Sequence, residues 1–483
     1  MSVYSAYWLV DASYRDWLHL SVTGRWDKHS TLPVQNNTYF YPSASLSVVL
    51  SEVLELPEVI SMLKLRGAYA KVGGSFNATS IGSIPSVSLS GNPLNYGSTY
   101  RTPYDGPSYR NSAIYSSPLV YNNQPGSYYA NTITNPDLKP SFSTANELGL
   151  DVAFFKNRLG LDMTYFKNID GPGIATITLP ESTGYTGAIV NGGKTKREGF
   201  EITLDAKPLV NSRGLNWNVM LNWATFKETI VEFADGQQRN GFFYVGDRVD
   251  KYFSGGYYTA PNGKYIYDAG GRPIVAPVAK YLGNINPDWS WGLVNKFSYR
   301  NWALMVQFDG RVGGVINNQI KRQTFRGGRN IETVQGAMGI AREQDTKGIK
   351  SYIGDGVVIS NGAAIKYDPL TGAIINYDEL QFAPNTTATF LQDWISRNYN
   401  QAENNMQDRT YAKLREVTLT YNFPESILAK TFIRNASLSL IGRNLLYFAK
   451  SDDFDVDQFV YGAGSDLQSP TLKRYGFNLN IIF

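Results

Sequence analysis

The sequence is dominated by segments in which apolar and polar residues alternate with a period of two. The last ten residues show this most fully, with Tyr475, Phe477, Leu479, Ile481 and Phe483 on one face and Arg474, Gly476, Asn478 and Asn480 on the other. Ile482 is the exception. The same alternation recurs in LGLDMTY (159–165), FEITLD (200–205) and LNWNVMLNW (215–223). Such alternation is typical of β-strands with one apolar face, so we predict an all-β chain.

Thirteen strands are predicted from this alternation. They cover 3–13, 17–27, 38–50, 62–73, 143–155, 159–168, 198–206, 214–227, 289–299, 302–312, 409–423, 435–448 and 472–483. Most are near the ~9–11 residues that a tilted strand needs to cross a bilayer. Short helical pieces are predicted only at 51–61 and 425–431.

The connections between these strands alternate between short and long. The short ones are 14–16, 51–61, 156–158, 207–213, 300–301 and 424–434, and the long ones are 28–37, 74–142, 169–197, 228–288, 313–408 and 449–471. Outer-membrane barrels have short periplasmic turns and longer extracellular loops at alternate ends of their strands. The pattern therefore predicts an antiparallel transmembrane β-barrel. The long loops are where function is expected.

Composition excludes several other classes of protein. The chain has 483 residues, no cysteine, two histidines and a net charge of +4, and 14% of its residues are aromatic against 18% charged. A disordered chain would be richer in charge and poorer in aromatic residues. Cysteine-based metal sites are excluded, no cofactor is expected, and the charge gives no case for nucleic acid. No apolar run is long enough for a transmembrane helix, and the first residues do not resemble a signal peptide.

Several motifs resemble the SusC/RagA family, the TonB-dependent outer-membrane importers of Bacteroidota. They are LKLRGAYAKVGG (63–74), NPDLKPSFSTANELGLDVAFFKNRLGLDMTYF (135–166), GGKTKREGFEITL (192–204), GNINPDWSWGLVNKFSYRNW (283–302), YAKLREVTLTYNFPESIL (411–428) and ASLSLIGRNLLYF (436–448). Their order fits the family, and they span nearly the whole chain. One departure is GRWDKHS (24–30), where the family usually carries a Gly-Ser-Ser run after the aspartate.

The resemblance implies a 22-stranded barrel with a plugged lumen, of which thirteen strands would leave nine to be supplied elsewhere. Residues 1–483 would then be the C-terminal part of the barrel, without the plug and the N-terminal strands. The implied partners are the chain or segment carrying those parts, TonB, a SusD-like surface lipoprotein and lipid. Counting strand directions back from a periplasmic C-terminus places residue 1 at the extracellular rim, so we expect strands 3–13 and 472–483 each to pair with a strand from outside this chain.

Two groups of strand residues have expected roles in the membrane. Aromatic residues near strand ends suit the interfacial girdles of a barrel, and these are Trp17, Trp26, Tyr299, Trp302, Tyr421, Phe448 and Tyr475. The alternative for them is ordinary packing on the sheet. The terminal series Tyr475, Phe477, Leu479, Ile481 and Phe483 resembles the signal for barrel assembly. Lipid contact is predicted for Leu161, Phe200, Leu204, Val219, Leu479 and Ile481.

A tyrosine-rich stretch lies in the connection 74–142. Its candidates for ligand contact are Tyr96, Tyr100, Tyr104, Tyr109, Tyr115, Tyr121, Tyr128 and Tyr129. Tyrosine offers an aromatic face to a sugar ring together with a hydroxyl group. Packing between loops, or contact with the lipoprotein, is the alternative. The acids Asp247, Asp250, Asp268 and Asp288 do not have the spacing of a calcium loop, so no metal site is predicted.

The function predicted is therefore import, not catalysis. We expect the chain to take up oligosaccharides, or oligopeptides, with no catalytic residues of its own. Two alternatives stay open at this point: a passive porin or adhesin barrel, and a soluble β-rich carbohydrate-binding protein or hydrolase. The alternating connection lengths and the terminal strand disfavour the soluble alternative, whereas only the family motifs disfavour the porin.

Overall fold

Thirteen antiparallel strands form the main sheet of the computed structural model, which describes residues 2–75, 111, 115–121, 124–129, 131–429, 431–450, 455–458 and 471–483. In sheet order they are β1 (Val3–Tyr14), β2 (Leu18–His29), β3 (Thr38–Val49), β4 (Ile60–Gly74), β8 (Ser141–Phe154), β9 (Leu159–Asp170), β12 (Lys194–Leu209), β13 (Leu215–Glu232), β19 (Trp289–Tyr299), β20 (Trp302–Val312), β25 (Tyr411–Asn422), β26 (Asn435–Ala449) and β27 (Arg474–Ile482). All thirteen predicted strands are confirmed. Each pairs with the next in the chain, so the short connections fall at one end of the strands and the long ones at the other.

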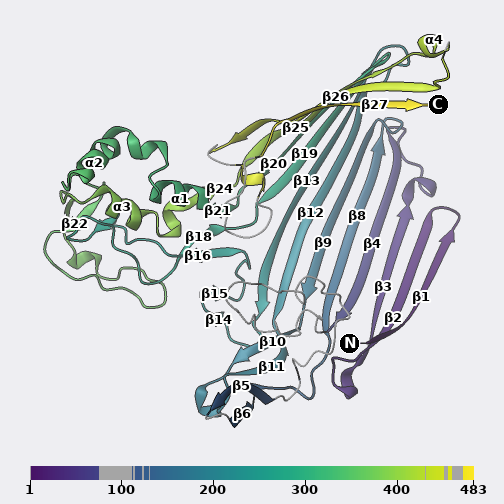
Figure 1. Ribbon diagram of the computed structural model, residues 1–483. Helices are drawn as coiled ribbons and strands as arrows, with labels where there is room; N and C mark the ends of the chain where they lie inside the picture. The colour runs from purple at the N-terminus through teal and green to yellow at the C-terminus, as the bar shows by residue number, and fades with distance from the viewer. Residues whose placement is uncertain are drawn as a thin grey trace. The chain divides into compact units, whose positions relative to one another are not determined.

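The chain divides into two compact units, and the first comprises Met1–Ala206 and Phe226–Val249. Its strands run side by side from β1 to β12 (Figure 1). The register aligns apolar residues across them in rows, and one row is Ala12, Leu20, Leu46, Gly67, Leu148, Tyr165 and Phe200. An adjacent row on the opposite face is Ser13, His19, Ser47, Arg66, Gly149, Thr164 and Glu201. The alternation in sequence thus becomes one apolar and one polar face.

The second unit comprises Lys207–Thr225 and Asp250–Phe483, and its strands follow the same rule. One apolar row is Trp217, Phe297, Leu304, Leu419, Leu440 and Phe477. A polar row on the other face is Asn216, Ser298, Ala303, Thr420, Ser439 and Asn478. A register shift between Gln307 and Phe308 adds a bulge in β25 at Arg415.

The long connections contain small folded elements. These are β5 (Tyr115–Tyr121), β6 (Gln124–Tyr129), β7 (Thr132–Ile133), β10 (Gly173–Thr178), β11 (Gly187–Gly192), β14 (Arg239–Asn240), β15 (Phe243–Tyr244), β16 (Lys251–Ser254), β17 (Ile266–Tyr267), β18 (Lys280–Asn284), β21 (Val315–Asn317), β22 (Val357–Ile359), β23 (Phe382–Pro384) and β24 (Met406–Asp408). The α-helices are α1 (Gln319–Arg326), α2 (Gly336–Thr346), α3 (Leu391–Asn398) and α4 (Glu425–Leu428). The 3-10 helices are η1 (Val34–Asn36), η2 (Leu50–Glu52), η4 (Glu181–Thr183), η5 (Ile331–Val334), η6 (Tyr377–Glu379), η7 (Ala402–Asn405) and η8 (Val456–Gln458).

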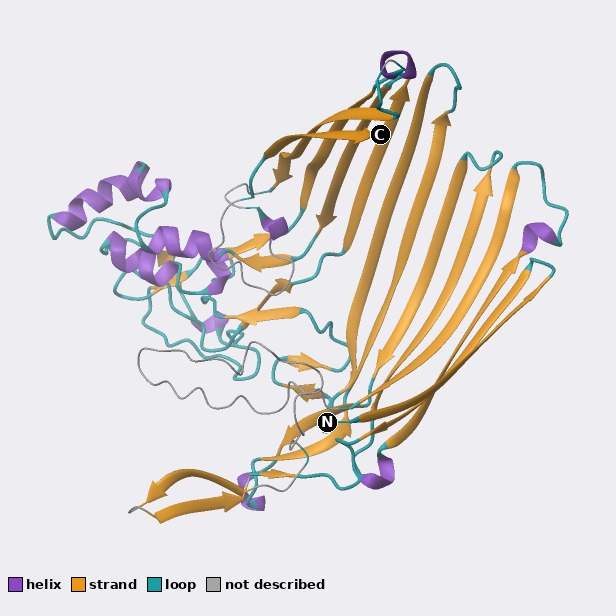
Figure 2. Cartoon of the chain, turned by 45° about the vertical axis from the view of Figure 1, so that its right-hand side comes forward, coloured by secondary structure: helices purple, strands orange, loops and turns teal. Residues whose placement is uncertain are grey.

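The two connections of the second unit that flank β19 and β20 form a compact subdomain. Figure 2 shows helices α1, α2 and α3 gathered there. Its core contains Ile266, Val357 and Leu380 in one cluster and Tyr267, Phe325, Leu391, Trp394 and Tyr399 in another. The three helices were not predicted. Of the predicted helical pieces, 51–61 contains only the end of η2, and 425–431 contains α4. No helix among the described residues is long and apolar enough to span a bilayer.

Candidate functional site

A cavity of about 860 Å³ lies in the first unit, at the end of the strands that carries the long connections. The ends of β4, β8, β9, β12 and β13 and the β10–β11 hairpin line it. Glycines allow these segments to converge. A Cβ on Gly192 would lie 2.6 Å from the carbonyl oxygen of Ala234, and Gly171, at a φ of 124°, contacts the backbone of Gly193. Only glycine fits such positions without displacing the neighbouring backbone.

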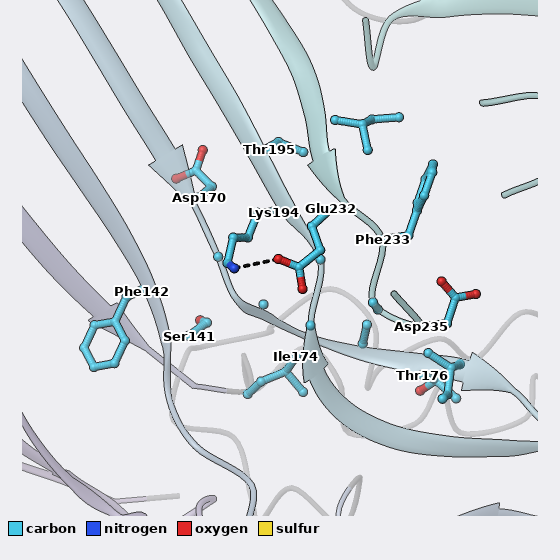
Figure 3. Close-up of a pocket in the computed structure, with 18 of the residues that line it drawn as sticks. Ser141, Phe142, Asp170, Ile174, Thr176, Lys194, Thr195, Glu232, Phe233 and Asp235 are labelled. Carbon is cyan, nitrogen blue, oxygen red and sulfur yellow. Dashed lines mark hydrogen bonds and ion pairs between the residues drawn. The ribbon is translucent and has the colours of Figure 1, made fainter. Parts of the chain in front are cut away.

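Among the described residues, the cavity lining combines hydrogen-bonding side chains, apolar side chains such as Val72, Ile177 and Ile230, and two phenylalanine rings. Carboxylates come from Asp170, Glu232 and Asp235, hydroxyl groups from Ser141, Ser143, Thr176, Thr178 and Thr195, and amides from Gln237 and Asn240. The aromatic residues are Phe142 and Phe233 (Figure 3). Phe142 and Ile174 pack against the buried cluster of Leu32, Tyr39, Leu138 and Ile189, which fixes that wall.

One ion pair lies in the middle of the cavity. Lys194 at the start of β12 donates to the Glu232 carboxylate at the end of β13 over 2.6 Å, as Figure 3 shows. Asp235 accepts a hydrogen bond from the backbone N–H of Gln237 at 3.1 Å. The carboxylate of Asp170 has no hydrogen-bond or ion-pair partner among the described residues. The described part of the lining thus holds three acids and one lysine, which is already ion-paired.

A second cluster of charged groups lies in the second unit, on the polar face of β20, β25 and β26. Lys413, only 1% exposed, bonds to Asp455 and to Asp457, the latter at 3.3 Å. Arg415 bridges Asp309, with bonds of 2.7 and 2.5 Å, and Asp457 at 2.7 Å. The acids at 455 and 457 flank the fully buried Val456, so they attach the start of the β26–β27 connection to the strands.

Asp457 is strongly acidic in this cluster. Burial raises its pKa, but hydrogen bonds from Arg415 and Tyr411 and the charges of Arg415 and Lys413 outweigh burial and lower the pKa to about 2. The Tyr411 hydroxyl donates to this carboxylate at 2.7 Å. The Asp457 carboxylate is therefore ionised at neutral pH.

Only some of the predicted ligand tyrosines lie among the described residues. Tyr96, Tyr100, Tyr104 and Tyr109 lie outside the described part of the chain. Tyr115, Tyr121, Tyr128 and Tyr129 lie on the β5–β6 hairpin, where Tyr115 pairs with Tyr129. Tyr129 is not one of the described residues that line the cavity. Sequence analysis missed the cavity, although two of its segments, VGG at 72–74 and GGKT at 192–195, belong to motifs already noted.

The predicted girdle residues fall at both ends of the strands. Trp17, Tyr299, Trp302 and Tyr421 lie beside short connections, and Trp26, Phe448 and Tyr475 lie beside long ones. Trp302 pairs with Tyr421 across β20 and β25, with ring centroids 4.7 Å apart. Trp26 contacts Phe40 in the same way at 4.5 Å. These contacts accommodate either a girdle or ordinary packing on the sheet, so the girdle stays a prediction.

The other predicted membrane residues occupy the expected rows. Leu161 pairs with Leu204, Tyr165 with Phe200, Leu438 with Leu479 and Ala436 with Ile481. Val219 lies on the same face as Trp217. In the terminal strand, Tyr475, Phe477, Leu479 and Ile481 alternate with polar residues, and Phe483 stacks on Phe432 at 5.5 Å. Their contact with lipid and their role in assembly remain predictions.

An antiparallel meander of long two-faced strands, with its connections sorted by length, defines a membrane barrel wall. The family model "TonB dependent receptor-like, beta-barrel" matches residues 2–330, so the chain belongs to this family of outer-membrane barrels. TonB-dependent receptor P3 of Formosa agariphila is 22% identical and matches 92% of this chain and 41% of that protein. TonB-dependent receptor P26 of the same organism is also 22% identical, over 98% of this chain and 45% of that protein.

Solved structures agree on the fold. The RagAB peptide importer in its 'open-open' state matches 100% of this chain and 47% of that chain, with a TM-score of 0.68 and 16% identity. The SusC/RagA resemblance and the barrel fold are therefore confirmed. The chain spans less than half the length of these relatives.

Proposed function

We propose that this chain forms part of the wall of a TonB-dependent importer in the bacterial outer membrane. The observation that carries the proposal is the thirteen-stranded meander with its long connections all at one end of the strands. In an outer-membrane barrel that end faces the outside, where substrate arrives. The C-terminus would then be periplasmic.

The partners follow from the same proposal. A plug and further strands would come from outside residues 1–483, and TonB would act on that plug. A SusD-like lipoprotein would cover the long connections, as the resemblance to the SusC/RagA family implies. The folded subdomain built on α1, α2 and α3 offers a firm surface on that side.

The substrate we propose is an oligosaccharide, with an oligopeptide as the alternative. The tyrosine-rich connection and the hydroxyl groups of the cavity support the sugar, whereas the similarity in fold to the RagAB peptide importer supports the peptide. No catalytic role is proposed.

The test is energised uptake by the bacterium that encodes the chain. Cells with and without the segment encoding residues 1–483 are given fluorescently labelled oligosaccharides and peptides, and internal label is measured with and without TonB. We expect uptake that needs both the segment and TonB. Uptake that needs the segment but continues without TonB would instead identify a passive porin. If cells that carry the segment internalise neither labelled ligand, import is rejected.

A further inference from the structure

We propose that the cavity bounded by Asp170, Lys194, Glu232 and Phe233 binds a short uncharged oligosaccharide. This inference rests on the proposed function only in placing the cavity on the substrate's route. It names a site formed by the ends of β4, β8, β9, β12 and β13 and by the β10–β11 hairpin. Its volume of about 860 Å³ falls within the ~300–1,000 Å³ usual for small-molecule sites.

The hydrogen-bonding groups suit a ligand that carries many hydroxyl groups. The carboxylate of Asp170 bonds to no described residue. Asp170, at the end of β9, is paired with Thr195 on the neighbouring strand β12. A carboxylate accepts hydrogen bonds from two neighbouring hydroxyls, and threonine and serine hydroxyls both donate and accept. Thr176, Thr178 and Ser141 supply such groups from the other walls. A sugar ring, with adjacent hydroxyls that donate and accept, satisfies this set.

The charge of the lining selects against anionic ligands. Among the described residues, three carboxylates and one cation line the cavity, and that cation, Lys194, already bonds to Glu232 at 2.6 Å. A uronic acid, a sulfate or an acidic peptide would have to break that pair to find a partner and would meet Asp170 and Asp235 as like charges. A nearby second cation, Lys71, does not line the cavity and is held 3.9 Å from the centre of the Phe142 ring.

An apolar surface completes the site. Phe233 lies at the cavity beside Asp235, at the end of β13, as Figure 3 shows. Its ring has no aromatic partner among the described residues, so it is available to the C–H face of a sugar. Phe142 is less suited, because Lys71 already covers its ring. A basic peptide would need only the carboxylates for binding. The hydroxyl groups and the free aromatic ring beside the acceptor therefore favour a sugar.

The test measures binding to the purified intact receptor by calorimetry. The probes are a panel of short neutral gluco-, galacto-, manno- and xylo-oligosaccharides, oligogalacturonides of matching length, and a lysine-rich tripeptide. The variants are Asp170→Ala and Phe233→Ala. Asp205→Ala is the matched control, since it removes an exposed carboxylate of β12 near the short connections. Each variant is folded if its unheated sample migrates in gel electrophoresis as the unheated wild type does.

We expect a neutral oligosaccharide to bind best. Asp170→Ala should weaken it by about tenfold or more, because a hydrogen bond to a charged group contributes on that scale. Phe233→Ala should also weaken it, because it removes the aromatic face on which the sugar packs. The control should bind like the wild type. Tighter binding of the oligogalacturonide or of the tripeptide would overturn the inference, and so would neutral-sugar binding that neither cavity variant changes.

The two proposals fail separately. TonB-dependent uptake that both cavity variants leave unchanged would reject the sugar site and keep the importer. Cavity-dependent sugar binding in a protein whose uptake does not need TonB would reject the importer and keep the site.

Discussion

At the scale of single residues, the charged cluster around Lys413 explains how a buried lysine is tolerated. Its ammonium group is almost fully enclosed, and an unpaired charge there would be strongly destabilising. Asp455 and Asp457 balance the charge of Lys413 by pairing with its ammonium group, and Asp457 also pairs with Arg415. The cluster therefore joins the β26–β27 connection to the polar face of β25.

Replacing this lysine should destabilise the barrel. Lys413→Met leaves two carboxylates with one fewer cation, and breaking a buried pair from one side costs about 3–5 kcal/mol. Because Arg415 still pairs with Asp457, the loss in free energy of unfolding should lie near the lower value. Chemical denaturation of the receptor in detergent, followed by tryptophan fluorescence, measures it. Lys473→Met, at an exposed lysine just before β27, is the control and should leave the unfolding midpoint in place. Equal midpoints for the two variants would contradict the role of the cluster.

The same cluster should respond to acid. The pKa of Asp457 falls from 3.8 to about 2 on folding, so its contribution to stability is complete above about pH 4 and disappears as the pH falls through 2. Residues 455–458 should therefore detach in that window, detected as faster hydrogen exchange after brief acid pulses. Asp457→Asn should abolish the dependence between these pH values. Detachment at pH 5–6 in the wild type would show that another group controls it.

At the scale of elements, the strands were predictable and the folded connections were not. Along each strand the apolar residues recur with a period of two, which the sequence displays directly, and strand pairing then aligns them in rows such as Trp217–Phe297–Leu304. Helices α1 to α3 are short, and α1 buries only Phe325 of its residues. Their core forms with Tyr267 and Trp394, which are far apart in the chain, so no local pattern reveals it.

The cavity was unpredictable for a related reason. Its lining comes from five strand ends and a hairpin, brought together by glycines whose close contacts exist only in the fold. Asp170 and Glu232 look like ordinary polar strand termini in the sequence. The tyrosine-rich connection attracted the prediction instead, because a local excess of one residue type is visible without any pairing.

A charge in the apolar row of the terminal strand tests the lipid-facing assignment. Leu479 is paired with Leu438 and is half exposed. Leu479→Arg should cost about 2–4 kcal/mol if this position lies near the bilayer midplane. Asn478→Arg, on the polar face of the same strand, is the matched control and should cost little. Folding titrations into lipid vesicles compare the two. Similar losses for both variants would show that neither face of β27 contacts lipid.

At the scale of the whole molecule, the main question is orientation in the membrane. The proposal places Ser2 and the long connections outside and the short connections in the periplasm. The chain contains no cysteine, so single cysteines report without background from it. In intact cells, Ser2→Cys should react with a membrane-impermeant maleimide, whereas Ser212→Cys in the short β12–β13 connection should react only after the outer membrane is opened. The reverse pattern would invert the barrel.

The two outer strands of the sheet should find partners beyond residues 1–483. Among the described residues, β1 pairs on one side only, with β2, and β27 pairs only with β26. Unpaired backbone groups in hydrocarbon cost several kcal/mol each, so both edges need a strand. A photo-crosslinking phenylalanine analogue at Tyr7 or Phe477 should therefore capture peptides from outside this chain, identified by mass spectrometry. The same analogue at Trp217, within the sheet, should capture only β12 or β19. Products joining Tyr7 to β27 would instead show that these strands close a smaller barrel by themselves, with too little room for a plug.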